Sequence, residues 1–449
     1  MHGMPYSGIH RKYSMTKPKA PKKSGNRKPS NPSNPSKTSG VAPGRHVRAA
    51  DVAGYGKLAL DATLGVVDMV GAMHHKIVDT PGVLENPLAK ALSEAADLVL
   101  GGIRDIAHST REGVDRLVQD ITPDIAQMES SVQREAVVSA FNGVVGDHLA
   151  SSNNPLAITM RLRQNGQALE LSKPALQAAV ATTAAAPISG KILLLVHGSC
   201  MNDLQWRRKN HDHGAALAAA HGFTAVYLHY NTGLHISSNG RQLASLLQEL
   251  VHAWPTAVQE LVIVAHSMGG LVSRSACHYA QQAGLDWLLR LSRMVFLGSP
   301  HHGAPLERGG NWVTLLLEAM PSTSAYAGLA KIRSSGVTDL RHGSLLDEDW
   351  AQGNRFAHTT DLPGFVPLPA LVKCYAVGAV LNKDLDNLVA TLLGDGMVPL
   401  HSALGKHDDP QRCLGIPQTN QAIFHGLNHL DLLSHPDVFA QLERWLVGG

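Results

Sequence analysis

The sequence of 449 residues predicts an α/β fold with a mostly parallel sheet, helices on both faces, a lid insertion and a helical N-terminal extension. From residue 191 onwards, short apolar runs alternate with longer segments of helical character. Such runs suit strands that are buried on both faces, and their alternation with helices is typical of right-handed βαβ units. A further observation is residues 261–270, where one apolar run leads directly into a Gly-rich turn and a predicted helix.

The first 50 residues differ in composition from the rest of the chain. They hold 11 of the 39 Lys and Arg residues and none of the 36 acidic residues. Because they contain few apolar side chains, residues 1–50 are predicted to be a disordered basic tail. A tail of this charge suits an anionic membrane surface, while a solvated tail without a partner and a transit peptide are alternatives. A nucleic-acid partner is not favoured.

Residues 51–150 are predicted to form a helical N-terminal extension. Apolar residues recur at helical spacing in 58–73, 88–108 and 110–120, and Pro or Gly separates these segments. The simplest interpretation is a helical cap packed on the following domain. The alternative is an amphipathic surface, which would allow peripheral membrane contact through residues 1–150.

The stretch 151–190 is predicted to be transitional, with early strands. Apolar runs at 144–149 and 156–162 are consistent with such strands. The dipeptide Asn165-Gly166 is a strong signal for a hairpin turn.

Residues 191–449 are predicted to be the main domain. Residues 303–370 interrupt the alternation of strands and helices, and an insertion of this length is often a lid over an active site. We expect buried strands at 192–196, 223–228, 261–264, 293–298, 372–377 and 421–424, and helices at 240–254, 270–280 and 437–446.

Cysteine usage and hydropathy favour a cytoplasmic protein. The four cysteines are far apart and form neither a disulfide framework nor a metal-binding spacing. The sequence has no N-terminal apolar leader and no apolar run of about 18 residues that would predict a spanning helix. Membrane association is left open by the basic tail and the helical extension.

The turn after the 261–264 strand has the features of a nucleophile elbow. Ala265, His266 and Gly269 flank Ser267, and small residues at such a turn let strand and helix approach each other. A phosphate-binding loop is the alternative, but that motif requires a Lys that is missing here. Ser267 is therefore the predicted nucleophile.

An activated serine needs a base and a carboxylate that orients the base. Asp395 lies between two glycines in a loop between the predicted lid and the last strand, so it is the predicted acid. Asp384 and Asp386 lie closer to the preceding strand and are the alternatives.

The base is expected after the last strand, because hydrolases with a doubly wound sheet carry their catalytic residues in the chain order Ser, acid, His. His429 lies in the loop between that strand and the final helix, so it is the predicted base. His425 lies at the strand end, and His435 precedes Pro436 at the start of the helix.

Two backbone N–H groups are expected to form an oxyanion hole. One would come from Met268, which follows the nucleophile, and the other from Ser199, which follows a His-Gly pair at the end of a buried strand. No metal or cofactor is predicted, because neither His211-Asp212-His213 nor His301-His302 has a second cluster with ligand spacing.

Five motifs together resemble the α/β-hydrolase superfamily, and within it the lipase-like serine esterases related to triacylglycerol lipases and GPI inositol-deacylases. The resemblance covers about residues 190–449, and residues 51–150 resemble, more weakly, the N-terminal extension of bacterial proteins of this group. Ala265 departs from the commonest lipase pattern, which has Gly there. The motifs are His197-Gly198, Ala265-His266-Ser267-Met268-Gly269-Gly270, Gly298-Ser299-Pro300-His301-His302-Gly303, Asp395-Gly396-Met397-Val398-Pro399 and Asn428-His429.

The resemblance implies an esterase or lipase that cleaves carboxylic esters through an acyl-enzyme, with a small-molecule or lipid ester as substrate. Apolar residues at 312–317 in the predicted lid favour an apolar acyl group. A thioesterase, amidase or acyltransferase would use the same triad, so these activities stay open. A membrane-surface adaptor with a vestigial hydrolase domain is the alternative from another class of protein.

Overall fold

The structure is a computed structural model that describes Gly54 and residues 132–183, 188–304, 334–351, 363–381 and 394–447. The chain divides into two compact units after Pro43, and every described residue belongs to the second unit. The predicted basic tail and most of the predicted extension, apart from Gly54 and residues 132–150, lie outside the described residues. So do 305–333 and 352–362, which make up most of the predicted lid.

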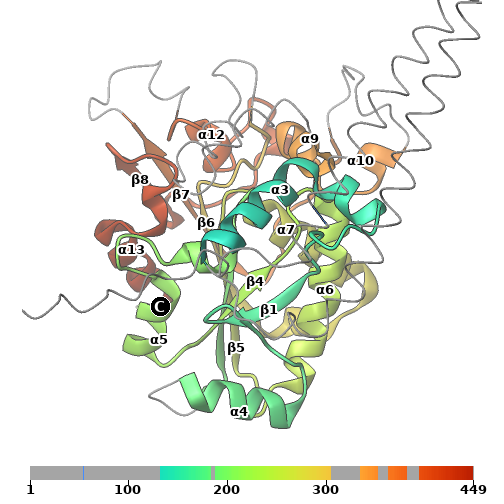
Figure 1. Ribbon diagram of the computed structural model, residues 1–449. Coiled ribbons are helices and arrows are strands. Elements are labelled where there is room, and N and C mark those ends of the chain that lie inside the picture. Colours follow the sequence, from blue (N-terminus) through green and yellow to red (C-terminus); the bar gives the residue numbers. More distant parts are fainter. Residues whose placement is uncertain are drawn as a thin grey trace, which may run out of the picture. The chain divides into compact units, whose positions relative to one another are not determined.

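Eight strands form one sheet in the described residues, in the order β2-β1-β4-β3-β5-β6-β7-β8 (Figure 1). Strands β3 to β8 are parallel, whereas β1 is antiparallel to both of its neighbours. Six of the strands match the six predicted ones, so the predicted mostly parallel sheet is confirmed. Their bounds are β1 Arg161–Gln164, β2 Gln167–Ala168, β3 Lys191–Val196, β4 Thr224–His229, β5 Glu260–His266, β6 Leu291–Leu297, β7 Lys373–Val380 and β8 Gln421–His425.

Helices cover both faces of the sheet (Figure 1). Helices α6 and α7 pack against each other on one face, and α5 and α13 contact each other on the other face. The α-helices are α3 Val132–Ser151, α4 Lys173–Thr183, α5 His213–His221, α6 Ile236–Ala253, α7 Met268–Ala283, α9 Ser335–His342, α10 Glu348–Ala351, α12 Leu400–Ala403 and α13 Pro436–Val447. The 3-10 helices are η2 Asp203–Trp206, η3 Asp286–Arg290, η5 Pro410–Arg412, η6 Gln418–Asn420 and η7 Asp431–Leu433.

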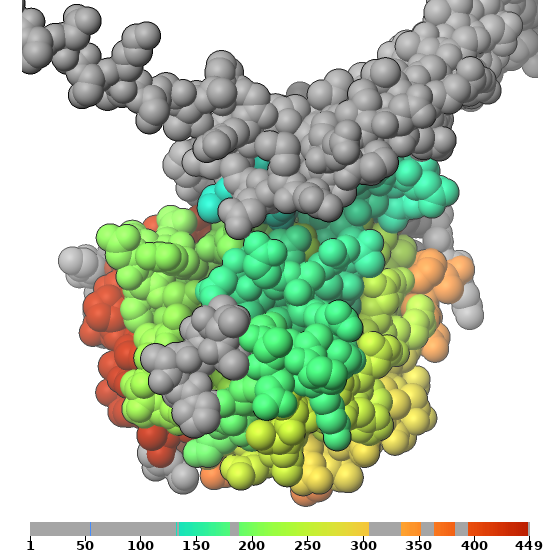
Figure 2. All heavy atoms as spheres, turned by 60° about the horizontal axis from the view of Figure 1, so that its bottom comes forward, coloured from blue at the N-terminus to red at the C-terminus, as the bar shows by residue number. Residues whose placement is uncertain are grey.

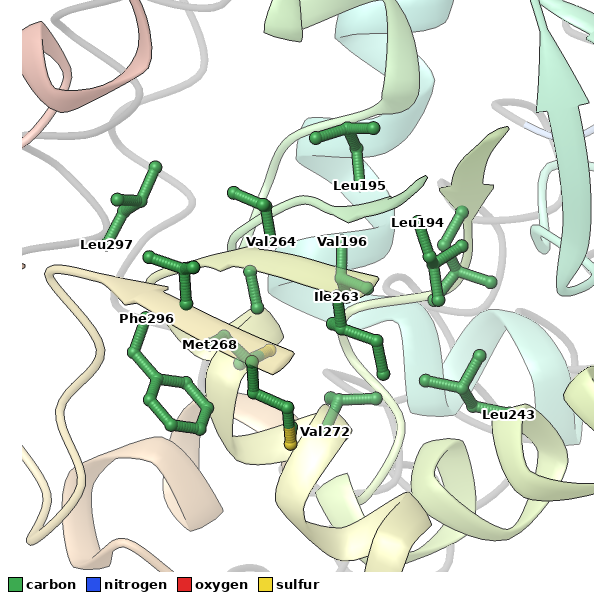
Figure 3. Close-up of a cluster of buried hydrophobic side chains, with 14 of the residues drawn as sticks. Leu194, Leu195, Val196, Leu243, Ile263, Val264, Met268, Val272, Phe296 and Leu297 are labelled. Carbon is green, nitrogen blue, oxygen red and sulfur yellow. The ribbon is translucent and has the colours of Figure 1, made fainter. Parts of the chain in front are cut away.

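The central strands are buried on both faces, as their unbroken apolar runs predict. In Figure 3, Ile263 and Phe296 point towards Val272 of α7, whereas Leu195 and Val264 point to the opposite face of the sheet. Side chains alternate along a strand, so each strand contributes to both halves of the core. The result is a rigid sheet from which the loops at the strand ends project.

The predicted strand at 144–149 is wrong, because these residues form the second half of α3. Phe141, Val144 and Leu149 lie at helical spacing and are buried, so the apolar run is one stripe of a helix. The short apolar run could not be distinguished from a strand by its periodicity alone. The predicted hairpin is confirmed: Asn165 and Gly166 have φ of 51° and 77° and connect β1 to β2.

Helix α3 belongs to the same core as the sheet. Its apolar residues join the main hydrophobic cluster, and the side chain of Asn231 donates a 2.9 Å hydrogen bond to the carbonyl of Gly146. Ser334, which caps α9, donates a 2.7 Å hydrogen bond to the carbonyl of Gly143. Figure 2 shows residues between α3 and α4, in teal and green, side by side on one face.

Candidate active site

The chain reverses its direction of winding beside β3. From β3 it crosses to β4 on one side, and from β4 it returns to β5 on the other side of β3. In open α/β sheets a crevice forms outside the carboxyl ends of the strands at such a point. There β3 leads into His197, Gly198 and Ser199, and β5 leads into Ser267.

Ser267 occupies a strained turn between β5 and α7. Its φ and ψ are 54° and −126°, and α7 begins at the next residue, Met268. A positive φ is uncommon for a residue with a side chain, and such strain is found mainly at functional sites. The neighbouring small residues are needed for space, because a Cβ on Gly269 would lie 2.4 Å from the carbonyl oxygen of Val196. The strand, sharp turn and helix expected around Ser267 are therefore present.

Replacing Gly269 by Ala should lower the free energy of unfolding by about 1–3 kcal/mol, because the added methyl group pushes α7 away from β3. Gly222→Ala is the matched control. A Cβ there meets nothing within 4 Å, although φ is 69°, so only the backbone strain is changed. Urea unfolding of both variants measures the difference. An unchanged free energy of unfolding in Gly269→Ala would contradict the close approach of α7 and β3.

Asp395 and His429 are brought together by two loops. The Oδ2 atom of Asp395 lies 2.7 Å from Nδ1 of His429, and each of the two residues is 2% exposed. The other carboxylate oxygen accepts hydrogen bonds from the backbone N–H groups of Met397 and Val398, at 3.0 and 2.8 Å. The backbone N–H of His429 donates to the carbonyl of Asp395 at 3.1 Å. The carboxylate is thus fixed on both sides and accepts the Nδ1 proton of the imidazole.

The second imidazole nitrogen of His429 has no partner among the described residues. Its Nε2 atom is buried and makes no hydrogen bond, so Ser267 and His429 are not hydrogen-bonded in this structure. A neutral histidine that donates its Nδ1–H to a carboxylate has no proton on Nε2. The lone pair of Nε2 can therefore accept a proton. Nucleophile–base contacts are often long in an enzyme without substrate and shorten when substrate binds.

His266 holds the loop that carries His429. Its Nε2 atom lies 3.1 Å from the carbonyl oxygen of His429, and the two rings lie 4.5 Å apart. Burial lowers the pKa of His266 well below its usual value, and the nearby His429 lowers it further. A neutral imidazole that donates from Nε2 is consistent with these contacts. The sequence pattern placed His266 only in the elbow, because its partner lies 163 positions away.

The loop after β3 lies directly against the nucleophile turn. A Cβ on Gly198 would lie 2.9 Å from Cβ of Ser267, so only glycine allows this approach. Cys200 has φ of 59°, and its N–H donates to the hydroxyl of Thr232 at 3.1 Å, which fixes the loop. Met268 is the first residue of α7, so its N–H has no acceptor within the helix.

A buried ionic network behind this loop was not predicted from the sequence. Arg163 lies 3.0 Å from Glu135 and 3.2 Å from Asp203, and Asp203 lies 3.1 Å from His229. Burial would raise the pKa of Asp203, but His229 and Arg163 outweigh it, so the pKa is lowered. The network joins α3, β1, β4 and η2, and η2 continues the loop that starts at His197.

The other candidate residues lie elsewhere or are engaged with different partners. His425 ends β8 and is exposed, and the ring of His435 accepts a 3.3 Å hydrogen bond from the N–H of Asp437. The rings of His211 and His213 are hydrogen-bonded to each other at 2.8 Å. Asp384 and Asp386 lie outside the described residues. Among the residues that the structure describes, no group of three or more His, Cys, Asp or Glu side chains is placed to bind a metal ion.

The strand order, the strained Ser turn after a central strand, and the chain order Ser, Asp, His define an α/β-hydrolase fold. Residues 157–340 match the model of a family described as a domain of unknown function, DUF7379. No curated protein matches the chain in sequence.

Solved structures of esterases and lipases resemble the chain at low identity. The mature lipase BlEst2 of Bacillus licheniformis is 17% identical with a TM-score of 0.39, over 58% of this chain and 94% of that chain. An esterase of the archaeon Pyrobaculum calidifontis is 13% identical with a TM-score of 0.33, over 56% of this chain and 72% of its own. The fold assignment therefore rests on the topology of the chain itself.

Among the residues that the structure describes, none of the helices is both long enough and apolar enough to cross a membrane.

Proposed function

We propose that this protein is a serine hydrolase that cleaves carboxylic esters through an acyl-enzyme. One observation carries the proposal. A buried imidazole, His429, is oriented by Asp395 at 2.7 Å and presents an unpartnered Nε2. The same imidazole belongs to a loop that His266, the residue before Ser267, holds by a hydrogen bond. An α/β-hydrolase with this arrangement has the parts needed to activate a serine.

In the proposed mechanism, Nε2 of His429 takes the proton of Ser267 as Oγ attacks the ester carbonyl carbon. Asp395 stabilises the imidazolium that forms, because its carboxylate accepts the Nδ1 proton. The N–H groups of Met268 and Ser199 would bind the developing oxyanion. His429 then donates its proton to the leaving alcohol, and a water molecule attacks the acyl-enzyme by the reverse sequence of proton transfers.

The acyl specificity is a separate question. Trp312 and the apolar residues that follow it, which favour an apolar acyl group, lie outside the described residues. A thioester, an amide or an acceptor other than water would use the same groups. Comparing one acyl chain as an ester, a thioester and an amide would distinguish these activities.

Labelling with a fluorophosphonate, followed by mass spectrometry of the labelled peptide, tests the proposal. We expect the label on Ser267, and a loss of at least about 10³-fold in labelling rate in His429→Ala. His425→Ala is the matched control, because this exposed histidine ends β8 four positions earlier. Labelling at another serine, or undiminished labelling in His429→Ala, would refute the proposal.

A further inference from the structure

A cavity outside the candidate active site lies beside α7 and is lined in part by basic side chains. Its volume is about 30 Å³, and none of Ser267, Asp395 and His429 lines it. No carboxylate contributes to its lining among the residues that the structure describes. Its basic lining residues are Arg274, His301, His302, His342, His407 and Arg412.

Arg274 is a buried cation without a carboxylate partner among the described residues. It is 2% exposed, and its guanidinium donates to the carbonyl oxygens of Val366 and His301. Burial lowers its pKa to about 10, so it is still charged near neutral pH. The Nε atom of Arg274 is buried and makes no hydrogen bond. Carbonyl dipoles offset only part of the cost of burying such a charge.

Two further N–H groups around the cavity lack acceptors. His301 is 3% exposed, and its Nδ1 atom lies 3.4 Å from a guanidinium nitrogen of Arg274. If Nδ1 accepts from Arg274, then Nε2 carries the proton, and this buried Nε2 has no partner among the described residues. Arg412 donates to the carbonyl of Pro363 at 2.7 Å, but its Nε is also buried without a partner.

A purely structural role for Arg274 leaves these features unexplained. It would account for the bonds to the two carbonyls, but not for a second guanidinium at the same cavity. Burial lowers the pKa of His302 to about 4, and the charges of Arg274, His407 and Arg412 lower it further. Asp349 is a nearby carboxylate, but it accepts from the N–H groups of Leu345, Leu346 and Gly364 and does not line the cavity.

We propose that Arg274, His301 and Arg412 bind a small monovalent anion of the size of chloride. An anion there would accept the unpartnered N–H groups and offset one of the two guanidinium charges. The volume of the cavity sets the size of the ion that it can hold. One water molecule needs about 10–15 Å³, so a cavity of about 30 Å³ suits one ion of the size of chloride. The bound ion holds α7 against the segments 301–302, 363–366 and 407–412. The inference does not depend on the proposed hydrolase activity.

The test compares thermal unfolding of the full chain in sodium chloride and in sodium gluconate at matched ionic strength. Gluconate is too large for the cavity, so it reports only general screening. We expect Tm to rise with the logarithm of the chloride concentration above Kd, by roughly 5 °C at about 100 times Kd. The rise should be lost in Arg412→Gln and retained in Arg444→Gln, an exposed arginine of α13.

Crystals grown or soaked in bromide provide an independent measurement. We expect an anomalous peak between Arg274, His301 and Arg412. Equal Tm curves in chloride and gluconate, together with an empty cavity in bromide, would overturn the proposal. A rise in Tm with phosphate but not with chloride would overturn the assignment to a chloride-sized ion.

Discussion

Replacing Asp395 by Asn should lower kcat for ester hydrolysis about 10⁴-fold, with little change in KM. The carboxylate accepts the Nδ1 proton of His429 at 2.7 Å. An amide cannot stabilise the imidazolium and favours the wrong tautomer, in which Nε2 carries the proton and cannot act as a base. Because these effects arise in the transition state, substrate binding should be nearly unchanged.

Steady-state hydrolysis of a chromogenic ester measures this effect. Asp437→Asn is the matched control, because this carboxylate lies in the first turn of α13 and its side chain is 76% exposed. Fluorophosphonate labelling of the Asp395→Asn variant should slow in parallel, while its unfolding curve shows whether the fold is kept. A decrease of less than about tenfold would mean that another carboxylate orients the base, and would refute the role of Asp395.

The elements around Ser267 could be predicted because their signals are local. A buried parallel strand reads as an unbroken apolar run, and a strained turn demands small residues at fixed offsets from the serine. For this reason β5, the turn and α7 agree with the sequence pattern. Asp395 is chosen over other acids by a local signal as well, because a glycine stands on each side of it. In the structure Gly394 and Gly396 have positive φ, at 57° and 92°.

The features that the sequence did not predict depend on residues far apart in the chain. Arg163 bonds Asp203 forty positions away, and His266 bonds the carbonyl of His429. No periodicity or spacing encodes such pairs, because they form only when several strands and loops are assembled. The misassigned run at 144–149 has a different cause, since its position on a helix is decided by packing against the core.

Acidification should unfold the protein well above the pKa of its carboxylates. Between about pH 6.5 and pH 5 we expect the free energy of unfolding to fall by several kcal/mol. Burial lowers the pKa of His197 to about 3 and of His213 to about 4, and it lowers the pKa of His266 and His301 well below 6.5. All four side chains are 3% exposed or less.

The sign follows from where the protons bind. Above about pH 6.5 these histidines are neutral in both the folded and the unfolded chain, so they add no pH dependence. Below that pH the histidines are protonated in the unfolded chain but remain neutral in the folded chain. The free energy of unfolding therefore falls until the pH reaches the pKa of the histidines in the folded chain. At about pH 5, His197 and His213 each contribute roughly 2 kcal/mol to the loss, and His266 and His301 act in the same direction. Burial raises the pKa of Asp339, so on acidification this side chain is protonated in the folded chain before it is protonated in the unfolded chain. Its protonation therefore stabilises the folded chain and offsets part of the decrease in the free energy of unfolding.

Urea unfolding at several pH values, followed by tryptophan fluorescence, measures the slope of stability against pH. His213→Gln should reduce this slope by about one proton, or roughly 1.4 kcal/mol per pH unit. The variant lacks one of the histidines that bind a proton only in the unfolded chain. His401→Gln is the matched control, since the side chain of His401 is exposed on α12. A free energy of unfolding that stays constant between about pH 5 and pH 7 would mean that the buried imidazoles are protonated in the folded chain. A neutral His266 would then no longer explain how the loop of His429 is held, so this measurement also bears on the site itself.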